Sequence, residues 1–270
     1  MRQKVLSWSH DYEDIILFHV FKNIENGFYF DIGANSPWDM SVTKFFYERN
    51  WRGINIEPLP IMHQELCSDR ERDINLCIGA GSKKDTLSLF VAEGGGAGST
   101  FNEELATFGF GKQVQISVPI ETADNILKEY LSDYKQDIHF CKIDVEGFEK
   151  EVLEGFDFDR YRPWVFAMES TKPNTTIPNY DKWEHILTEN GYDFVLMSGV
   201  NRYYIDNAKG HLKSRFISPK QLLEIHDIFH VTHQRLLDNK HFKLGLAITA
   251  PYRVAKKILL QIIRKISFKA

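Results

Sequence analysis

Four acidic residues stand where apolar runs of the chain end. Asp31 follows FYF, Glu57 follows INI, Asp144 follows FCKI and Glu169 follows WVFAM. Carboxylates at such positions can accept hydrogen bonds from hydroxyls, take a proton from a reacting group or bind a divalent cation. Because ligands bind at the carboxyl ends of parallel strands, we expect these acids to converge on one site.

The residues after Phe30 indicate which ligand the first strand end binds. The order Asp31, Ile, Gly33, Ala34, Asn35 places one residue without a Cβ in a tight turn. Glu57 lies 24 residues beyond Gly33, near the ~20 expected for an acid that binds ribose hydroxyls. A pyrophosphate site needs three glycines, and an acid would repel a pyrophosphate. These residues therefore favour a cationic, phosphate-free nucleoside such as S-adenosylmethionine over a nicotinamide dinucleotide, with a purely structural turn as the alternative.

The elements that must position these residues alternate between strands and helices. Strands are expected at 28–32, 52–57, 73–78, 86–92, 113–120, 138–143 and 164–168, and helices at 5–26, 40–50, 60–68, 121–131, 148–155 and 180–192. Residues 193–199 and 201–206 are expected to form an antiparallel pair, and Ser9 or Asp11 to cap the first helix. The alternation predicts an α/β fold with a doubly wound, mostly parallel sheet.

Three ordered blocks resemble the FkbM family of S-adenosylmethionine-dependent methyltransferases. They read FYFDIGANSPWDMSVTKFFYERNWRGINIEP, KIDVEGFEKEVLEG and RPWVFAMES, and the lead-in SWSHDYEDIIL is similar to the start of that family. The likeness covers roughly residues 9–205. It implies a class I, Rossmann-like methyltransferase with a seven-stranded sheet, and O-methylation, commonly of sugar or polyketide hydroxyls.

The resemblance also assigns roles to individual residues. It implies that Asp31, Gly33, Ala34 and Asn35 form the cofactor turn and that Glu57 is the ribose acid. Pro58, Gly79 and Asp144 are the further residues expected to bind the cofactor. The block Lys142, Asp144, Glu146 and Gly147 matches the family as well. The chain departs from the usual pattern at 36–38, which leaves open the group that lies over the substrate there.

The reaction itself needs an activated acceptor. Methyl transfer is an in-line displacement, so the enzyme positions the acceptor oxygen and removes its proton. Asp144, Glu146 and Glu169 are the candidate catalytic residues. They could act as a base, or Asp144 and Glu169 could hold Mg²⁺ or Mn²⁺ to acidify the hydroxyl; a structural role for the acids is the third reading.

The Gly-rich stretch 93–100 ends in hydroxyl-bearing residues that suit a sugar. Ser99 and Thr100, together with Lys142, are the candidate substrate-binding residues, and Gly98 precedes them. The stretch could close over the substrate, or it could be a plain flexible connection.

Two further residue sets contain side chains that can bind metals or form disulfides. His226, His230 and His233 fall on one face of an expected helix, where a packed or solvated stripe is favoured over a metal site. The three cysteines, Cys67, Cys77 and Cys141, form no CxxC pair and suggest no disulfide framework. Cys77 and Cys141 stand inside strand-like runs and are expected to be buried thiols.

Composition and charge bound the partners. The chain has 270 residues, 43% hydrophobic and 26% charged, and neither a signal peptide nor an apolar run of the ~20 residues that span a membrane, so a cytoplasmic protein is expected. Residues 251–270 hold six Lys/Arg and no acid, which leaves 27 basic against 37 acidic side chains in residues 1–250. An acidic body argues against nucleic-acid binding.

The basic end has its own pattern. Apolar residues recur on one helical face of 251–270 with Lys and Arg around it, as in an interfacial helix attracted to anionic lipid. This predicts peripheral contact at the inner face of the membrane; packing on the protein or on a partner subunit of an oligomer is the alternative.

The expected organisation is a helical lead-in at 1–26, a methyltransferase domain at 27–210 and a helical extension at 211–270 that includes this tail. The expected function is O-methylation of a sugar hydroxyl in a glycan, glycolipid or nucleotide-sugar during polysaccharide biosynthesis. The alternatives are methylation of a polyketide or other small-molecule hydroxyl, and an inert glycan-binding module of the same fold.

Overall fold

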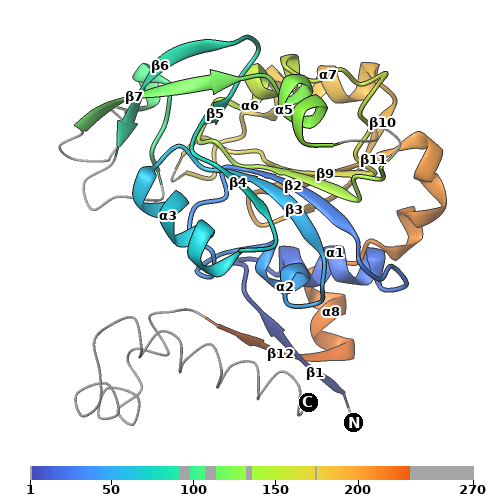
Figure 1. Cartoon of the computed structure of the whole chain (residues 1–270). Helices are drawn as coiled ribbons and strands as arrows, with labels where there is room; N and C mark the ends of the chain where they lie inside the picture. The colour runs from blue at the N-terminus through green and yellow to red at the C-terminus, as the bar shows by residue number, and fades with distance from the viewer. Residues whose placement is uncertain (1, 92–97, 107–113, 132–135, 174, 232–270) are drawn as a thin grey trace, which may run out of the picture.

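The computed structural model describes residues 2–91, 98–106, 114–131, 136–173 and 175–231. A seven-stranded sheet in the order β10-β11-β9-β8-β2-β3-β4 forms its centre (Figure 1). The strands are β2 (Phe28–Ile32), β3 (Arg52–Ile56), β4 (Ile74–Leu76), β8 (Phe140–Ile143), β9 (Val165–Glu169), β10 (Tyr192–Ser198) and β11 (Asn201–Asp206). Strands β4, β3, β2, β8 and β9 pair in parallel, and β11 joins β9 and β10 antiparallel. The mixed α/β architecture with a large, mostly parallel sheet is confirmed.

The strand order places the expected turn at the middle of the sheet. From β2 the chain proceeds to β3 and β4 on one side, and later enters β8 and β9 on the other. Asp31 therefore lies in register with Asn55 of β3 and Lys142 of β8. A crevice at such a reversal of strand order is where open α/β sheets bind ligands.

Side-chain alternation along the strands produces a core on each face of the sheet. Tyr29 belongs to one core and the neighbouring Phe30 to the other, because successive strand side chains point to opposite faces. Helices α1 (Glu13–Phe21) and α2 (Lys44–Tyr47) cover the first face; α5 (Ala123–Tyr130), α6 (Glu149–Glu154) and α7 (Glu184–Glu189) cover the second (Figure 1). Helix α3 (Pro60–Asp69) connects β3 to β4.

The two strands expected at 86–92 and 113–120 exist, but in a smaller sheet. Strands β6 (Asp85–Val91) and β7 (Val114–Glu121) pair antiparallel, and β5 (Gly79–Ala80) joins β7 in parallel. Their core contains Leu89, Val118 and Ile120 and packs on Leu59. The short helix α4 (Glu103–Ala106) lies between β6 and β7 in the sequence. Gly79 of β5 and Ser99, next to the bridge between Thr100 and Phe90 of β6, both line the cavity of the central sheet.

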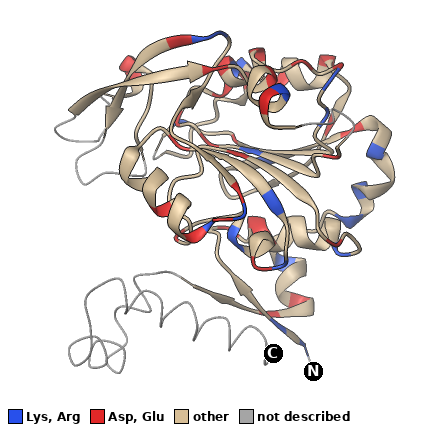
Figure 2. Cartoon of the chain, viewed as in Figure 1, with Lys and Arg blue, Asp and Glu red and all other residues tan. Residues whose placement is uncertain are grey.

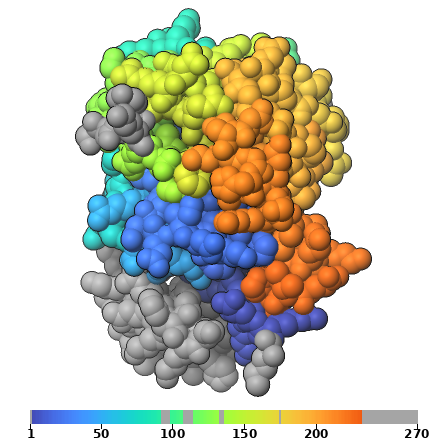
Figure 3. Space-filling model, turned by 90° about the vertical axis from the view of Figure 1, so that its right-hand side faces the viewer, coloured from blue at the N-terminus to red at the C-terminus, as the bar shows by residue number. Residues whose placement is uncertain are grey.

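The expected helix over 5–26 is wrong at its beginning. Residues Gln3–Ser7 form strand β1, which pairs in parallel with β12 (His226–His230), and α1 begins only at Glu13. The helix cap is Tyr12 rather than Ser9 or Asp11, although the Asp14 N–H donates to Ser9 Oγ. Pairing with a distant strand has overridden a helix-like local pattern. In Figure 3 the N-terminal segment lies beside the last described residues.

The expected helical histidine face is also wrong. His226 and His230 lie four residues apart in β12, and a rise of about 3.3 Å per residue separates them by about 13 Å. These two cannot share one ion. His233 lies outside the described residues, as do Gly94, Gly95 and Gly96.

Three expected helices are shorter than their apolar patterns. The 40–50 segment is helical only in α2, 148–155 only in α6, and 180–192 is divided between η1 (Tyr180–Lys182) and α7. The chain then continues through η2 (Asn207–Arg215) and α8 (Pro219–Ile225), which Ser218 caps together with Gln221.

Acidic and basic residues are interspersed over the described helices and loops (Figure 2). Cys67, Cys77 and Cys141 are free thiols. Cys141 is buried as expected, whereas Cys77 lies just after the end of β4 and is only partly buried. Across the described part of the chain, no helix combines the length and apolar character needed to cross a bilayer.

Candidate active site

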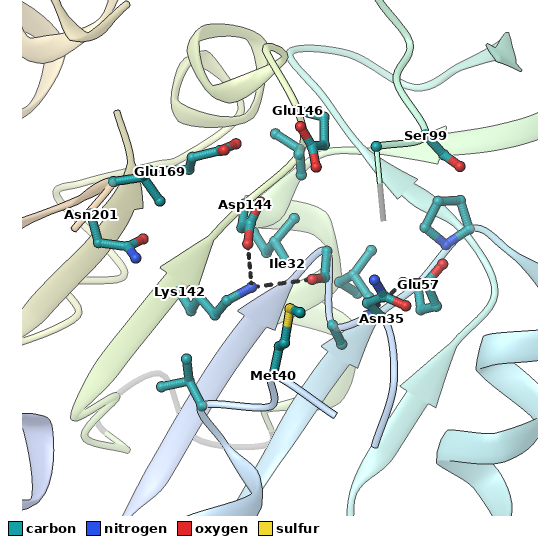
Figure 4. A pocket seen from close by; sticks show the side chains of 18 of the residues that line it. Ile32, Asn35, Met40, Glu57, Ser99, Lys142, Asp144, Glu146, Glu169 and Asn201 are labelled. Carbon is teal, nitrogen blue, oxygen red and sulfur yellow. Dashed lines mark hydrogen bonds and ion pairs between the residues drawn. The ribbon is translucent and has the colours of Figure 1, made fainter. Parts of the chain in front are cut away.

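A cavity of about 930 Å³ opens at the carboxyl ends of β2, β3 and β8. It brings together most of the residues expected from the sequence (Figure 4). Those that line it are Gly33, Ala34, Asn35, Glu57, Pro58, Gly79, Ser99, Lys142, Asp144, Glu146 and Glu169. Asp31 and Thr100 do not line it.

The turn after β2 is fixed by its neighbours on both sides. Gly33 has φ +81°, and a Cβ there would lie 1.9 Å from the carbonyl oxygen of Asp144. The N–H groups of Gly33 and Ala34 both donate to the carbonyl of Ile56, at 3.0 Å each. Only glycine fits this turn, because the backbone bends into a left-handed conformation directly against β8.

Glu57 lies beside this turn at the end of β3. Its Oε2 accepts the N–H of Asn35 at 2.7 Å, and its Oε1 accepts the N–H of Leu59 at 2.8 Å. Burial raises the pKa of Glu57 to about 7, although the two backbone donors lower it. Each carboxylate oxygen retains a second acceptor position, so Glu57 can still receive ribose hydroxyls from the cavity.

Lys142 links the turn to the acids at the floor of the cavity. Its Nζ donates to the Gly33 carbonyl at 3.2 Å and lies 3.3 Å from Asp144 and 3.7 Å from Asp31. Burial lowers the pKa of Lys142, but the Asp144 and Asp31 carboxylates outweigh it and raise the pKa above its usual value. Asp31 is 1% exposed and also accepts the hydroxyl of Thr43. It therefore lies behind the turn and supports it through Lys142.

Three carboxylates meet at the far side of Lys142. Asp144, Glu146 and Glu169 each have an oxygen within 4.8 Å of the other two, and Figure 4 shows them around one region of the cavity. Burial raises the pKa of Glu146 to about 8, with the charges of Asp144 and Glu149 adding to the shift. Burial, followed by the charge of Asp144, raises the pKa of Glu169 well above its usual range. Such a cluster can accept a proton near neutral pH or hold a cation with oxygen ligands.

The two hydroxyl-bearing residues expected to contact the substrate, Ser99 and Thr100, have different surroundings. Ser99 lines the cavity, whereas Thr100 is fully buried and its hydroxyl donates to the Glu146 carbonyl at 2.7 Å. The Thr100 hydroxyl also accepts the N–H of Asn102. Thr100 therefore anchors the turn that presents Glu146.

The segment 36–38, where the sequence departs from the pattern of the family that it resembles, does not line the cavity. Ser36 Oγ accepts the N–H groups of Trp38 and Asp39, and Asp39 and Met40 instead face the cavity. The fully buried Arg70 braces this loop, since its guanidinium donates to the Pro37 carbonyl at 2.8 Å.

Sequence reasoning missed one wall of the cavity. His10, Glu13 and Asn201 line it together with residues of the 171–177 segment. Glu13 Oε1 accepts the Asn201 side-chain N–H at 2.9 Å across 188 positions of sequence. No local pattern predicts such a contact; the Glu-Asp pair in the lead-in SWSHDYED was the available signal.

A tight glycine turn after the first strand of the sheet, with an acid at the end of the next strand, is typical of α/β proteins that bind a nucleoside. Residues 31–194 match the family described as "Methyltransferase FkbM domain", and the chain belongs to this family of methyltransferases. Membership implies S-adenosylmethionine as the methyl donor. The matched segment contains the turn, Glu57 and the three clustered acids, while Glu13 and Asn201 lie outside it.

A curated relative agrees with the family. The chain is 32% identical over 97 residues to "Methyltransferase sdnD" of Sordaria araneosa, across 34% of this chain and 36% of the relative. The match thus spans about a third of the relative's length.

Proposed function

We propose that this protein is an S-adenosylmethionine-dependent O-methyltransferase that acts on a sugar hydroxyl of a glycan, glycolipid or nucleotide-sugar. The observation that carries the proposal is one cavity with two unlike halves. Glu57 and the Gly33 turn form a nucleoside half, and clustered carboxylates form an acceptor half. The two halves meet at Asp144.

The nucleoside half fits the methyl donor. Gly33 leaves room where any side chain would collide with backbone, and Glu57 offers acceptor positions for ribose hydroxyls. Lys142 is the one Lys or Arg among the described lining residues, against the acids Glu13, Asp39, Glu57, Asp144, Glu146 and Glu169. This negative lining suits a cofactor with a net positive charge, and the cofactor supplies an electrophilic methyl group when bound.

The acceptor half suits proton removal. A hydroxyl loses its proton as its oxygen attacks, and a carboxylate whose pKa lies near the working pH is the better acceptor. Glu146, with a pKa near 8, meets that condition, while Asp144 is held in place by Lys142. A divalent cation at Asp144 and Glu169 is the second way in which these residues could activate a hydroxyl.

The cavity wall that contains Glu13 and Asn201 supports an acceptor with several hydroxyl groups. Its described lining includes Glu13, Asn201 and the threonines 171, 175 and 176. Ser99 lies on the opposite side of the cavity from Asn201 (Figure 4). Carboxylate, amide and hydroxyl groups together can donate to and accept from several sugar hydroxyls. A polar wall of this kind motivates the choice of a sugar over an apolar small molecule.

The decisive experiment incubates the purified chain with methyl-labelled cofactor and glycan extracts, and locates the label by mass spectrometry. Label on a sugar oxygen is the expected result. Label on a polyketide or other small molecule would overturn the choice of acceptor. Calorimetry that detects no binding at millimolar S-adenosylmethionine would point instead to an inert module.

We further propose that the protein works in the cytoplasm, attached to the inner face of the membrane through residues 251–270. These residues lie outside the described part of the chain, so the argument is their basic, amphipathic sequence. Co-sedimentation with anionic liposomes should be lost on truncation after residue 250. Equal partitioning of the two forms would contradict the attachment.

A further inference from the structure

The acceptor half of the cavity holds more carboxyl groups than its described cations could balance if all of them were ionised. Lys142 lies 3.3 Å from Asp144, and it is also shared with Asp31. No described ion pair reaches Glu146 or Glu169. Two buried or half-buried carboxylates thus lack a cationic partner within the described structure, and such groups are costly to ionise without one.

The oxygens of this cluster are spaced as ligands of one ion. Asp144, Glu146 and Glu169 each offer an oxygen within 4.8 Å of the other two. Two oxygens on opposite sides of one Mg²⁺, each bound at about 2.0–2.1 Å, lie about 4.2 Å apart. Oxygens within 4.8 Å of one another therefore need to approach by about 0.6 Å at most. Glu169 ends β9 and Asp144 follows β8 directly, while Glu146 lies in the next turn, which Thr100 anchors. The sheet and this anchored turn together set the spacing.

Glu169 gives an independent indication that something binds here. It is 8% exposed, and its Oε2 accepts no hydrogen bond in the described structure. Glu146 Oε2 is likewise buried and without a hydrogen-bond partner. In Figure 4 the Glu169 side chain extends into the cavity toward the other two acids. Buried polar atoms nearly always have a hydrogen-bond or metal partner, and a bound ligand would supply one to each of these two oxygens.

We propose that Asp144, Glu146 and Glu169 bind one hard divalent cation, Mg²⁺ or Mn²⁺. All three ligands are carboxylates, which select these ions over softer metals. Three protein ligands leave about three of six positions open, and the cavity on that side is lined by Asn201 and Glu13. A sugar with two neighbouring hydroxyls could fill two of those positions. This role in activating the acceptor rests on the proposed function, whereas the binding of the cation does not.

The test measures binding of Mn²⁺ alone to the full chain. Free Mn²⁺ is followed by electron paramagnetic resonance during titration, with and without S-adenosylhomocysteine. One saturable site is expected, with Mg²⁺ as a competitor. Glu169→Gln and Glu146→Gln should each weaken binding at least tenfold, and Glu169→Asp should retain weakened binding because it keeps the charge.

Glu154→Gln is the matched control, since Glu154 is an exposed acid of α6 that pairs only with Lys150 among the described ion pairs. It should leave Mn²⁺ binding unchanged. Calorimetric binding of S-adenosylhomocysteine shows that each variant is folded.

Two results would overturn the site: wild type without saturable Mn²⁺ binding, or folded Gln variants that bind Mn²⁺ as wild type does. Either would leave a proton shared among the acids as the account of their proximity. Methyl transfer in EDTA, in a protein that does not bind Mn²⁺, would refute the cation site and support the proposed function. Mn²⁺ binding without methyl transfer would support the cation site and refute the proposed function.

Discussion

Replacing Glu57 with Gln tests the nucleoside half of the cavity most directly. Glutamine keeps the shape but has one acceptor oxygen, whereas Glu57 uses both oxygens for the N–H groups of Asn35 and Leu59. The variant therefore cannot satisfy both N–H groups and also receive the ribose hydroxyls. Hydrogen bonds to charged groups contribute about 1.5–3 kcal/mol, so the affinity for S-adenosylhomocysteine at pH 8 should fall roughly 10- to 150-fold.

The same substitution should change how stability depends on pH. Folding raises the pKa of Glu57 from 4.5 to about 7 through burial. A raised folded pKa means that the group's contribution is fully present below pH 4.5 and is lost as pH rises through about 7. Glu57→Gln is neutral throughout, so its stability relative to wild type should increase across this window by on the order of 3 kcal/mol.

Calorimetry at pH 8 and urea unfolding between pH 5 and 8 measure these two effects. Glu154→Gln again serves as the control, and both quantities should match wild type. Unchanged cofactor affinity in a folded Glu57→Gln protein would refute the ribose assignment. A stability difference that does not widen with pH would refute the argument from burial.

Three further substitutions separate the parts of the site. Gly33→Ala should abolish binding of S-adenosylhomocysteine and lower the free energy of unfolding by more than about 2 kcal/mol. The control Gly210→Ala, whose new Cβ meets nothing closer than 3.9 Å, should be near neutral. Equal effects of the two substitutions in calorimetry and unfolding would contradict the close approach at Gly33. Arg70→Met should lower stability by about 3 kcal/mol, because it leaves the buried Asp73 without its cation. It should also raise the cofactor KM, because Arg70 supports the 36–38 loop through the Pro37 carbonyl. An unchanged KM would show that this loop keeps its position without Arg70. Asn201→Ala should raise the acceptor KM about tenfold, the value of one hydrogen bond, with the cofactor affinity unchanged; a shift in the cofactor affinity alone would move this residue out of the acceptor half.

The parallel strands and their acidic ends were predictable because each is a local pattern. An apolar run that stops at an acid predicts both a strand and the residue at its carboxyl end. This pattern predicts the positions of Glu57 and Asp144 at strand ends without knowledge of the rest of the chain. Glu169 follows the same rule. The three end up around one cavity because parallel strands share an edge.

What the sequence did not predict depends on contacts between distant residues. The helix-like spacing of 5–26 contains no sign that β1 pairs with β12, and the histidines of β12 look helical until that pairing is known. Thr100 resembles a substrate ligand in sequence, but its hydroxyl is used by the Glu146 carbonyl. The Glu13–Asn201 contact is of the same kind.

The pairing of β1 with β12 also orders events during synthesis. Gln3 is opposite His226 and Ser7 is opposite His230, so β1 has no strand to pair with until more than two hundred residues have followed it. The sheet from β2 to β9 can assemble earlier, while β1 is still unpaired and Asn201, the partner of Glu13, has yet to be made. Long-range pairing of this type is slow to form. The cofactor half of the cavity can thus be complete in a nascent chain in which Glu13 has not yet reached Asn201 of the acceptor wall.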